Sequence, residues 1–378
     1  MKILFIGPYR QPNEWGRKSR SVLQALKKID NSIVTSRPIC LSNSMITYDN
    51  YIENAEFIIE SDYDILIQFL LPSLTVYDGN FSKRIGIFNT ETIPYNLPKA
   101  QLTGECLMDE VWTDSVRIRD SLQTLFDKYE TNTKAIAMPP TLDVQLAPSG
   151  LNQSIRTSSA DLQDQFLFYY IGNILDNKSG FQETCLAYLS TFTNSDLTTL
   201  VIGLETNISP DQIDAVINQY RKMVQTYIPV SKQATIHVVS PQNQILDPME
   251  RAAIHMGSDC LISVGYAFSA NTTVLEGAIY HNTPIVTKHN ACYEWLGNQH
   301  LWGIESYDDL CTFATTSPIS RFTVGELWDK PIIKSLSEMM NHVYVNKFER
   351  DKKQAANVSL RPKFEQMTYS NLVNGNIL

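Results

Sequence analysis

Short apolar runs rich in β-branched residues alternate along this chain with segments in which apolar residues recur at helical spacing. In the first part of the chain the strand-like runs fall at Ile3–Ile6, Ile33–Thr35, Ile65–Leu70, Ile85–Phe88, Val111–Thr113 and Ala135–Met138. The later runs fall at Phe166–Ile171, Thr199–Ile202, Thr235–Val239, Leu261–Val264 and Ile285–Thr287. Alternation of this kind is typical of parallel sheets with helices on both faces. The pattern predicts an α/β protein with two Rossmann-like domains that face a central cleft.

The two series of strands are separated by residues 143–165, which are rich in Pro, Gly, Ser, Asn and Gln and show little periodicity. This composition is typical of a linker. We therefore predict one domain over residues 1–160 and a second over residues 161–349. A chain of 378 residues is long enough for each domain to have its own core.

Charge and cysteine content narrow the classes of function. The formal net charge is −9, so the surface as a whole does not attract nucleic acid or anionic lipid. The six cysteines are scattered and contain no C-x-x-C pair, which argues against a disulfide framework and against a zinc site. The first apolar run is too short for a signal peptide or a membrane span, so we expect a cytoplasmic protein.

The stretch Asp259–Thr287 reads DCLISVGYAFSANTTVLEGAIYHNTPIVT and has the pattern strand, loop, helix, strand. Asn271, Thr272 and Thr273 fall at the start of the helix, and Glu276 lies one turn inside it. The first N–H groups of a helix suit phosphates, and a fixed carboxylate suits the hydroxyls of a sugar. The stretch therefore predicts a site for a phosphorylated ligand. An ordinary strand–helix–strand crossover without a ligand is the alternative.

These features together resemble glycosyltransferase family 4, a retaining family of GT-B architecture that uses nucleotide-activated sugars. The resemblance covers nearly the whole chain and depends on four segments in the family's order. They are IFNTETIPYNLPKAQLTGECLMDEVWTDSVRIRDSL at Ile87–Leu122, FYYIGNILDNKSGFQETCLA at Phe168–Ala187, the Asp259–Thr287 stretch, and the helical segment Phe348–Met367. The last resembles a helix that crosses back to the first domain, which residues 350–378 are expected to complete.

The resemblance implies a donor site in the second domain. Gly172, followed by Asn173, matches the glycine after the first donor-domain strand, and Lys178 matches the lysine that binds the leaving diphosphate. Glu276 matches the second glutamate of a pair separated by seven residues and would hold the ribose hydroxyls. Ser269 would line the sugar pocket. The competing interpretations are a solvated loop lysine and an exposed helix glutamate.

The chain also departs from the family pattern. The first glutamate of the pair should stand eight residues before Glu276, and that position is Phe268. The two positions where the family has an arginine are Asn173 and Asn177. Because negative charge develops on the leaving diphosphate, Lys178 and the helix start at Asn271 would have to stabilise it alone.

All six histidines lie after residue 230, so the first domain has no imidazole base. Their absence favours a retaining reaction or a carboxylate base. Glu91, Asp109 and Asp114 are the first-domain candidates, and Glu91 is preferred because it matches the family's glutamate. The alternative for Glu91 is a capping or surface carboxylate.

The first helical segment, Gly16–Lys28, is strongly basic for an acidic protein. It contains Arg17, Lys18, Arg20, Lys27 and Lys28. Such a face could contact an anionic membrane with a lipid-linked acceptor, or a nucleic acid, and a solvated helix face is the alternative. Gly16 would let the preceding loop approach the donor.

We therefore predict a glycosyltransferase that moves a sugar from a nucleotide-diphosphate sugar to a glycan, lipid-linked or nucleic-acid acceptor, with retention of configuration. The nucleotide sugar is a co-substrate, and we expect neither a permanently bound cofactor nor a metal. One alternative is a non-catalytic glycosyltransferase-like subunit, for which Phe268, Asn173 and Asn177 argue. Another is a viral-type transferase that glycosylates modified bases in DNA.

Overall fold

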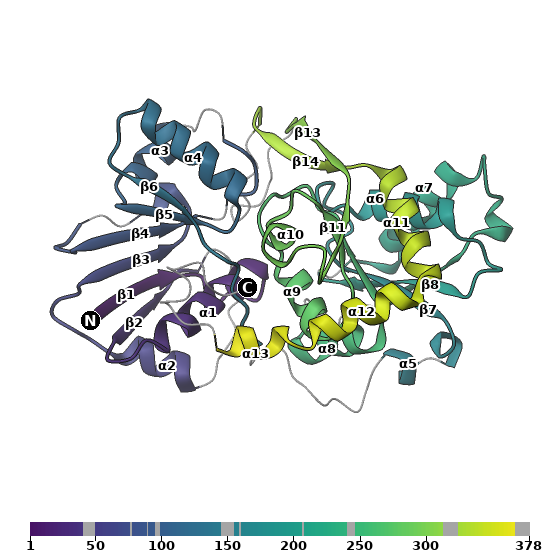
Figure 1. Ribbon diagram of the computed structural model, residues 1–378, viewed down its shortest axis with the longest axis horizontal. Helices are drawn as coiled ribbons and strands as arrows, with labels where there is room; N and C mark the ends of the chain where they lie inside the picture. Colours follow the sequence, from purple (N-terminus) through teal and green to yellow (C-terminus); the bar gives the residue numbers. More distant parts are fainter. Residues whose placement is uncertain are drawn as a thin grey trace.

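The computed structural model describes residues 1–40, 50–75, 78–88, 90–94, 99–144, 155–158, 160–205, 208–239, 246–312 and 324–366. Residues 145–154 of the predicted linker, and residues 367–378 of the segment predicted to complete the first domain, lie outside these ranges. Within them the chain forms two six-stranded parallel sheets and a two-stranded hairpin. The two sheets lie side by side with helices packed around them (Figure 1). The predicted α/β class with two Rossmann-like units is confirmed.

The first sheet has the strand order β2-β1-β3-β4-β5-β6, with every neighbouring pair parallel. The elements of this half are β1 (Lys2–Gly7), α1 (Glu14–Lys27), β2 (Ile33–Pro38), α2 (Asn50–Phe57), β3 (Ile65–Phe69), β4 (Lys83–Ile87), α3 (Lys99–Cys106), β5 (Glu110–Thr113), α4 (Val116–Lys128) and β6 (Lys134–Ala137). The order turns back between β1 and β3. Ligands of open α/β sheets bind beyond the carboxyl ends of the strands at such a point.

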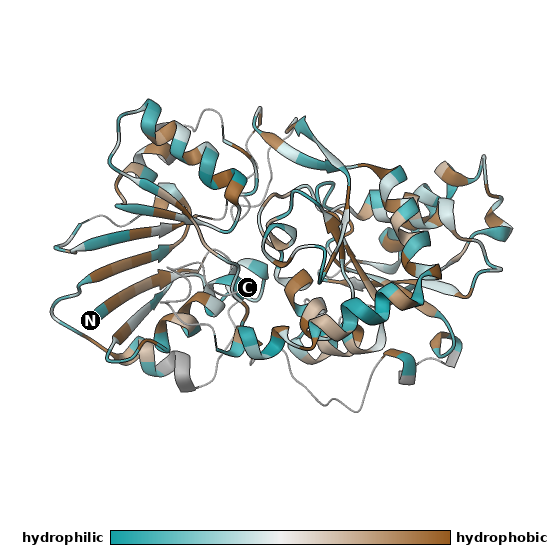
Figure 2. Cartoon of the chain, viewed as in Figure 1, coloured by the Kyte–Doolittle hydropathy of each residue, from teal (hydrophilic) through white to brown (hydrophobic). Residues whose placement is uncertain are grey.

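The second sheet has the order β12-β11-β10-β7-β8-β9 and is also parallel. Its elements are α5 (Ile155–Ser158), β7 (Phe166–Gly172), α6 (Phe181–Thr191), β8 (Thr198–Leu204), α7 (Pro210–Val224), β9 (Thr235–Val239), α8 (Pro248–Gly257), β10 (Cys260–Ser263), α9 (Thr272–Ile279), β11 (Ile285–Thr287), α10 (Ala291–Leu296) and β12 (Trp302–Ile304). Strand β7 is central and every residue after Phe166 in it is buried. Figure 2 shows the hydrophobic residues concentrated in the strands of both sheets.

Two features follow the second sheet. An antiparallel hairpin joins β13 (Ser306–Leu310) to β14 (Leu327–Pro331), and the sequence pattern did not predict it. Helices α11 (Ile333–Val345), α12 (Lys347–Asn357) and α13 (Leu360–Glu365) come next. The last two run from the second half toward the first (Figure 1), where the Lys28 ammonium donates to the Glu365 carbonyl (2.6 Å). No helix in the described part of the chain is long and apolar enough to cross a membrane.

The apolar core is continuous across the two halves. One cluster of buried side chains contains Phe5 and Leu23 of the first half together with Val274 of α9. Leu360 and Phe364 of α13 belong to the same cluster. The final helix therefore packs on both halves, as the resemblance implied. The residue boundaries predicted for the two domains stay a prediction.

Local sequence signals explain where the helices near the interface begin. Asn13 caps α1 by accepting from the Gly16 N–H, Ser115 caps α4, and Asn271 caps α9 by accepting from the Thr273 N–H. Short polar side chains satisfy the first N–H groups of a helix, so each of these residues fixes a helix start. All three helix starts point toward the boundary between the two halves, where carboxylates of the opposite half also lie.

Candidate functional site

A cavity of about 290 Å³ lies between the two halves. Its first-half lining is Asn13, Glu14, Trp15, Lys18 and Glu91. Its second-half lining is Tyr170, Ile171, Gly172, Asn173, Asp176, Lys178, Ser179, Glu205, Ser263, Gly265, Tyr266, Ala267, Asn271 and Thr273. The lining comes from the carboxyl ends of β7, β8 and β10 and from the loop before α1. Polar groups of both halves therefore converge on one space at the expected edge of the second sheet.

The structure brings six of the predicted site residues together in this cavity. They are Glu91, Gly172, Asn173, Lys178, Asn271 and Thr273. The other four, Gly16, Ser269, Thr272 and Glu276, lie behind the wall of the cavity and do not line it. The ligand-binding roles of all ten residues stay predictions, because this geometry shows position and not occupancy.

Lys178 lies in the turn that follows β7. Its side chain is buried, and its ammonium lies 3.7 Å from the Asp176 carboxylate. Gly180, two residues on, has a positive φ of 76°, and a Cβ there would lie 2.4 Å from the Val264 carbonyl oxygen. Only glycine allows this approach of the turn to β10. The turn is thus held against the second sheet, and Lys178 is a fixed cation at the cavity wall.

The N-terminus of α9 is already occupied by carboxylate and amide oxygens. The Thr272 N–H donates to Glu14 Oε1 (3.0 Å), and the Thr273 N–H donates to Asn271 Oδ1 (2.8 Å). The Ala270 N–H, just before the helix, donates to Asp114 Oδ2 (3.0 Å). The sequence analysis expected these N–H groups to be available to phosphates. In this closed arrangement the first half supplies two carboxylates that take the place of an anion there.

Glu276 belongs to a buried ion-pair network and is not the exposed helix glutamate of the alternative interpretation. The Arg251 guanidinium donates to both Glu276 and Glu205. Arg17 of α1 also reaches this network, with Nη2 3.1 Å from Glu205 and Nε 3.7 Å from Glu276. His255 lies 3.5 Å from Glu276 on the other side. A ribose would therefore have to displace or share these partners to reach the Glu276 carboxylate.

Electrostatics fix the charge states of this network. Burial disfavours the charged form of Glu276, but Arg251 and the hydrogen bond with His255 outweigh burial and hold its pKa well below the usual range. The pKa of Glu205 is lowered in the same way, against burial, by Arg17 and Arg251. Burial lowers the pKa of His255. Both carboxylates are therefore ionised at neutral pH.

The lowered pKa of Glu276 predicts a loss of stability in acid. Its contribution is complete above the unfolded-state pKa of about 4.3 and is lost as the pH falls, because the unfolded state then binds a proton that the folded state excludes. Between pH 6 and pH 3 the wild-type protein should lose about 1–2 kcal/mol more unfolding free energy than Glu276→Gln. Urea titrations at both pH values measure this, with the exposed Glu338→Gln as the matched control. If wild type and Glu276→Gln lose the same unfolding free energy between pH 6 and pH 3, the pKa of Glu276 is not lowered in the folded protein.

The basic helix α1 does not form an outer basic face. Arg17 and Arg20 are buried, and Arg20 donates to the carbonyls of Tyr9 (2.8 Å) and Gln11 (2.9 Å). Lys18 lies 3.6 Å from Asp114 and 3.9 Å from Glu14. Arg17 and Lys18 are turned inward toward carboxylates and Arg20 toward backbone carbonyls, while Lys28 is exposed. Three of the five cations behind the predicted membrane or nucleic-acid contact are therefore used inside the protein, and that contact stays a prediction.

Phe268, which stands where the family has a glutamate, is an anchor between the halves. Its ring is fully buried in a cluster with Phe88 and Ile118 of the first half. The Arg117 guanidinium lies over the ring, 4.7 Å from its centroid. The Phe268 N–H donates to the Glu91 carbonyl (3.0 Å), so this residue also fixes the backbone of the predicted catalytic glutamate.

Several other residues, of which Gly16, Ser269 and Asp109 were predicted, have structural roles. A Cβ on Gly16 would lie 2.0 Å from the Gln11 carbonyl oxygen, so this glycine lets α1 pack against its own preceding loop. The Ser269 carbonyl accepts from the Asn290 side chain (2.8 Å). Glu294 accepts from the Val116 N–H (2.8 Å) and caps α4 across the interface. Asp109 is exposed and accepts from the Arg84 N–H (2.7 Å), so it is not a base for the cavity.

Glu205 and Glu14 are cavity residues that the sequence analysis missed. Glu205 directly follows β8, and the rule that ligands bind beyond the carboxyl ends of parallel strands would have found it. Glu14 opens α1 and carries no comparable signal, because its partner Thr272 is 258 residues away. Arg251, which pairs with Glu205, lies mid-helix in α8 and was also not identifiable from the sequence pattern.

One group of side chains among the described residues could hold a metal ion. His289, Asp308 and Asp329 place ligand atoms within 4.8 Å of one another. None of them lines the cavity. The Arg117 guanidinium donates to both oxygens of Asp308, and His289 Nδ1 lies 3.1 Å from Asp329, so the group is already balanced by charge. It gives no reason to assign a metal to the cavity.

Solved structures match almost the whole of this chain. A trehalose-6-phosphate protein from E. coli, bound with UDP-2-fluoro glucose, aligns with a TM-score of 0.64 over 100% of this chain and 99% of its own, at 10% identity. The Anabaena protein HepE, in complex with UDP and glucose, aligns with a TM-score of 0.58 over 100% of this chain and 98% of its own, at 12% identity. A UDP-forming α,α-trehalose-phosphate synthase from Burkholderia xenovorans, in complex with glucose-6-phosphate, aligns with a TM-score of 0.61 over 99% of this chain and 98% of its own, at 10% identity.

Sequence comparison adds nothing to these structural matches. No protein-family profile matches the chain, and no curated protein matches it significantly. Identities of 10–12% show similarity of fold and leave membership of glycosyltransferase family 4 a prediction. The matches extend over nearly the full length of both chains. The protein has the GT-B fold of glycosyltransferases.

Proposed function

We propose that this protein is a glycosyltransferase that uses a nucleotide-diphosphate sugar as donor and retains the configuration of the transferred sugar. The single observation that carries the proposal is the cavity of about 290 Å³ between the halves, with Lys178 and Glu205 on one wall and Glu91 on the other. The proposal is supported by matched GT-B structures that hold UDP or a UDP-sugar analogue. A uridine nucleotide is therefore the first donor to test.

The cavity residues divide into donor and acceptor roles. In the second half, Lys178 and the turn after Gly172 would face the diphosphate, and Glu205 would accept hydrogen bonds from sugar or ribose hydroxyls. In the first half, Glu91 would face the acceptor. Both Lys178 and Glu91 lie on segments fixed by backbone contacts to residues 264–268. This fixed placement suits electrostatic catalysis, which needs charges held in position before the reaction.

The proposed reaction replaces the diphosphate by the acceptor oxygen at the anomeric carbon. The bond between the anomeric carbon and the diphosphate oxygen breaks, and its electron pair stays on the diphosphate beside Lys178. The acceptor oxygen bonds to the anomeric carbon, and its proton passes to a carboxylate, for which Glu91 is the candidate. The first half contains no histidine, so we expect attack from the face that the diphosphate leaves. No metal is part of this proposal, since Lys178 supplies the positive charge.

Nucleotide binding and the Lys178→Ala variant test the proposal together. UDP at a hundred times its Kd should stabilise the wild-type protein by about 2.7 kcal/mol. Removal of a charge-assisted contact worth about 1.5–3 kcal/mol should weaken UDP binding, and lower donor hydrolysis, by about tenfold or more. Thermal shift with UDP, GDP and ADP and hydrolysis of a nucleotide-sugar panel measure both effects. The exposed Lys334→Ala is the matched control.

No stabilisation by any nucleotide at millimolar concentration would overturn the proposed donor site. Normal hydrolysis by Lys178→Ala would show instead that the cation at the diphosphate is a different residue. The two results are separable, because the first concerns the cavity and the second concerns one side chain in it.

A non-catalytic glycosyltransferase-like subunit is the second candidate function. The observation in its favour is that Phe268 replaces a glutamate and is locked into the apolar cluster of the first half, while Glu276 is held by Arg251. A subunit of this kind would bind a nucleotide or a glycan without turnover. UDP binding with no donor hydrolysis and no transfer to any acceptor would favour it over the enzyme.

A further inference from the structure

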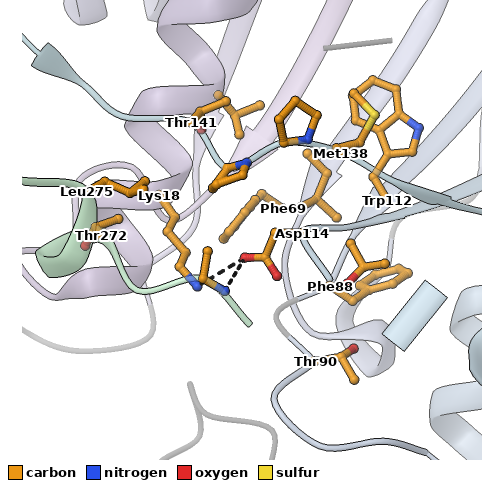
Figure 3. A pocket seen from close by; sticks show the side chains of 16 residues that line it. Lys18, Phe69, Phe88, Thr90, Trp112, Asp114, Met138, Thr141, Thr272 and Leu275 are labelled. Atoms are coloured by element: carbon orange, nitrogen blue, oxygen red, sulfur yellow. Dashed lines mark hydrogen bonds and ion pairs between the residues drawn. The ribbon is translucent and has the colours of Figure 1, made fainter. Parts of the chain in front are cut away.

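A second and smaller cavity, of about 70 Å³, lies at the carboxyl ends of β3 to β6 of the first sheet (Figure 3). Its lining includes Lys18, Val22, Phe69, Trp112, Asp114 and Met138. Lys18 also lines the larger cavity described above, so this side chain borders both spaces. The smaller cavity therefore lies on the acceptor side of the proposed donor site.

Most of the wall of this cavity is apolar. Phe69 and Trp112 are each 3% exposed and Phe88 is 2% exposed, and Met138 lies beside Trp112 (Figure 3). The Trp112 Nε1–H donates to Glu110 (3.0 Å), so its N–H is satisfied outside the cavity and its ring faces remain as wall. A cavity with such walls disfavours water and accepts apolar groups.

The size of the cavity restricts the group that it can accept. A cavity of about 150 Å³ lined by aliphatic and aromatic side chains accepts benzene. The present cavity has less than half of that volume, which suits a short branched alkyl group and is too small for a whole sugar ring or an aromatic ring. Each methylene that fits such a pocket changes binding by about 1–3 kcal/mol, so the pocket can select for length and branching.

The polar end of the cavity is the pair formed by Lys18 and Asp114 (Figure 3). The Lys18 ammonium lies 3.6 Å from Asp114 Oδ2, and the Ala270 N–H fixes the same oxygen. A hydroxyl at this end would meet a carboxylate acceptor and an ammonium donor at Lys18, the residue that borders both cavities. Lys18 is the cation of this lining, and two carboxylates, Asp114 and Glu14, already surround it. A phosphate group would be repelled here.

We propose that the acceptor is an alcohol carrying a short branched alkyl group, which occupies this cavity while the reacting hydroxyl lies at its Lys18 end, next to the larger cavity that Glu91 lines. This inference rests on the proposed glycosyltransferase function and names its acceptor class. It excludes a sugar phosphate as the acceptor, because Lys18, the cation of the lining, is already paired with Asp114 and Glu14. The alkyl group is held by Phe69, Trp112 and Met138, and the hydroxyl points toward the donor cavity.

An acceptor competition with matched probes tests the proposal. Consumption of the nucleotide sugar found active above is followed with isobutanol, isoamyl alcohol, phenol, glycerol and a hexose phosphate as acceptors. Isobutanol and glycerol are similar in size, so their comparison isolates the apolar group. We expect alkyl glycoside formation with the two branched alcohols at least tenfold above that with glycerol, and none with the hexose phosphate.

Variants of Val22, whose side chain reaches the cavity from α1, localise the effect. Val22→Phe should fill the space and raise the KM for isobutanol at least tenfold. Val22→Ala should enlarge the space and shift the preference from isobutanol toward phenol. The matched control is Val224→Ala, a buried valine of α7 outside both cavities, which should keep the wild-type preference. Circular dichroism checks that each variant is folded.

The outcomes separate this inference from the function on which it rests. Donor hydrolysis with transfer to the hexose phosphate or glycerol, but not to the branched alcohols, would overturn the acceptor class and leave the glycosyltransferase proposal standing. An unchanged isobutanol preference in folded Val22→Phe would overturn the placement of the alkyl group. If no nucleotide binds and no donor is hydrolysed, the proposed function fails and the acceptor class fails with it.

Discussion

Replacement of Arg251 by alanine is expected to lower the free energy of unfolding by about 3–5 kcal/mol, which is the cost of breaking a buried ion pair from one side. The Arg251 side chain is only 5% exposed and donates to Glu205, Glu276 and Thr273. Without it, two buried carboxylates would face each other with only Arg17 and His255 beside them. The neutral His255 cannot replace the lost charge, since burial lowers its pKa.

Urea unfolding at pH 7 measures the effect of Arg251→Ala. Arg119→Ala removes an arginine from an exposed pair with Asp120 and is the matched control, which should change stability by less than about 1 kcal/mol. A loss for Arg251→Ala no larger than that of the control would show that the network contributes little. Acid should reduce the difference, because protonation of Glu205 and Glu276 in the unfolded state removes the advantage of the paired state.

The second large effect is expected at Phe268. Phe268→Ala should destabilise the protein by about 3–5 kcal/mol, because the ring is fully buried among first-half residues and its removal leaves a cavity. Phe268→Glu, which restores the family's residue, should be at least as destabilising, since it buries a carboxylate in an apolar cluster. Arg117 above the ring would offset part of that cost.

Calorimetry measures the effect of the Phe268 variants on stability, and nucleotide binding measures their effect on the donor site. The exposed Phe348→Ala is the matched control and should be nearly neutral. If Phe268 joins the halves as described, its variants should also weaken the coupling between UDP binding and the stability of the first half. If Phe268→Ala is as stable as the wild type, Phe268 does not hold the two halves together. Increased turnover in a folded Phe268→Glu would show that the missing glutamate limits catalysis.

The sequence predicted the fold well because the fold depends on local patterns. An unbroken apolar run predicts the buried strand Phe166–Gly172. Asn271, followed by apolar residues at helical spacing, predicts α9. The hairpin β13–β14 was missed because its strands carry Asp308, Asp309 and Asp329, which break the apolar alternation. It is held from outside, where the Ile93 N–H donates to the Leu327 carbonyl (2.9 Å).

The candidate site could be located from the sequence but not completed. Lys178 and Gly172 were found because a turn after a buried strand is a local signal. The partners of Glu276 were not, since Arg17 is 259 positions away along the chain and reads as part of a basic helix face. Long-range charge pairing leaves no periodic trace in the sequence. For the same reason the sequence does not show that Glu14 and Asp114 accept hydrogen bonds at the N-terminus of α9.

The last helix of the described chain has a consequence for biosynthesis. Leu360 and Phe364 belong to the same apolar cluster as Phe5 and Leu23, which lie about 340–360 residues earlier in the chain. A ribosome adds about 5–20 residues per second, so the first half waits for roughly 17–70 seconds before the side chains that close its core are made. During that time its unfilled apolar surface is exposed to chaperones. The nascent chain is therefore expected to depend on them until synthesis passes Phe364.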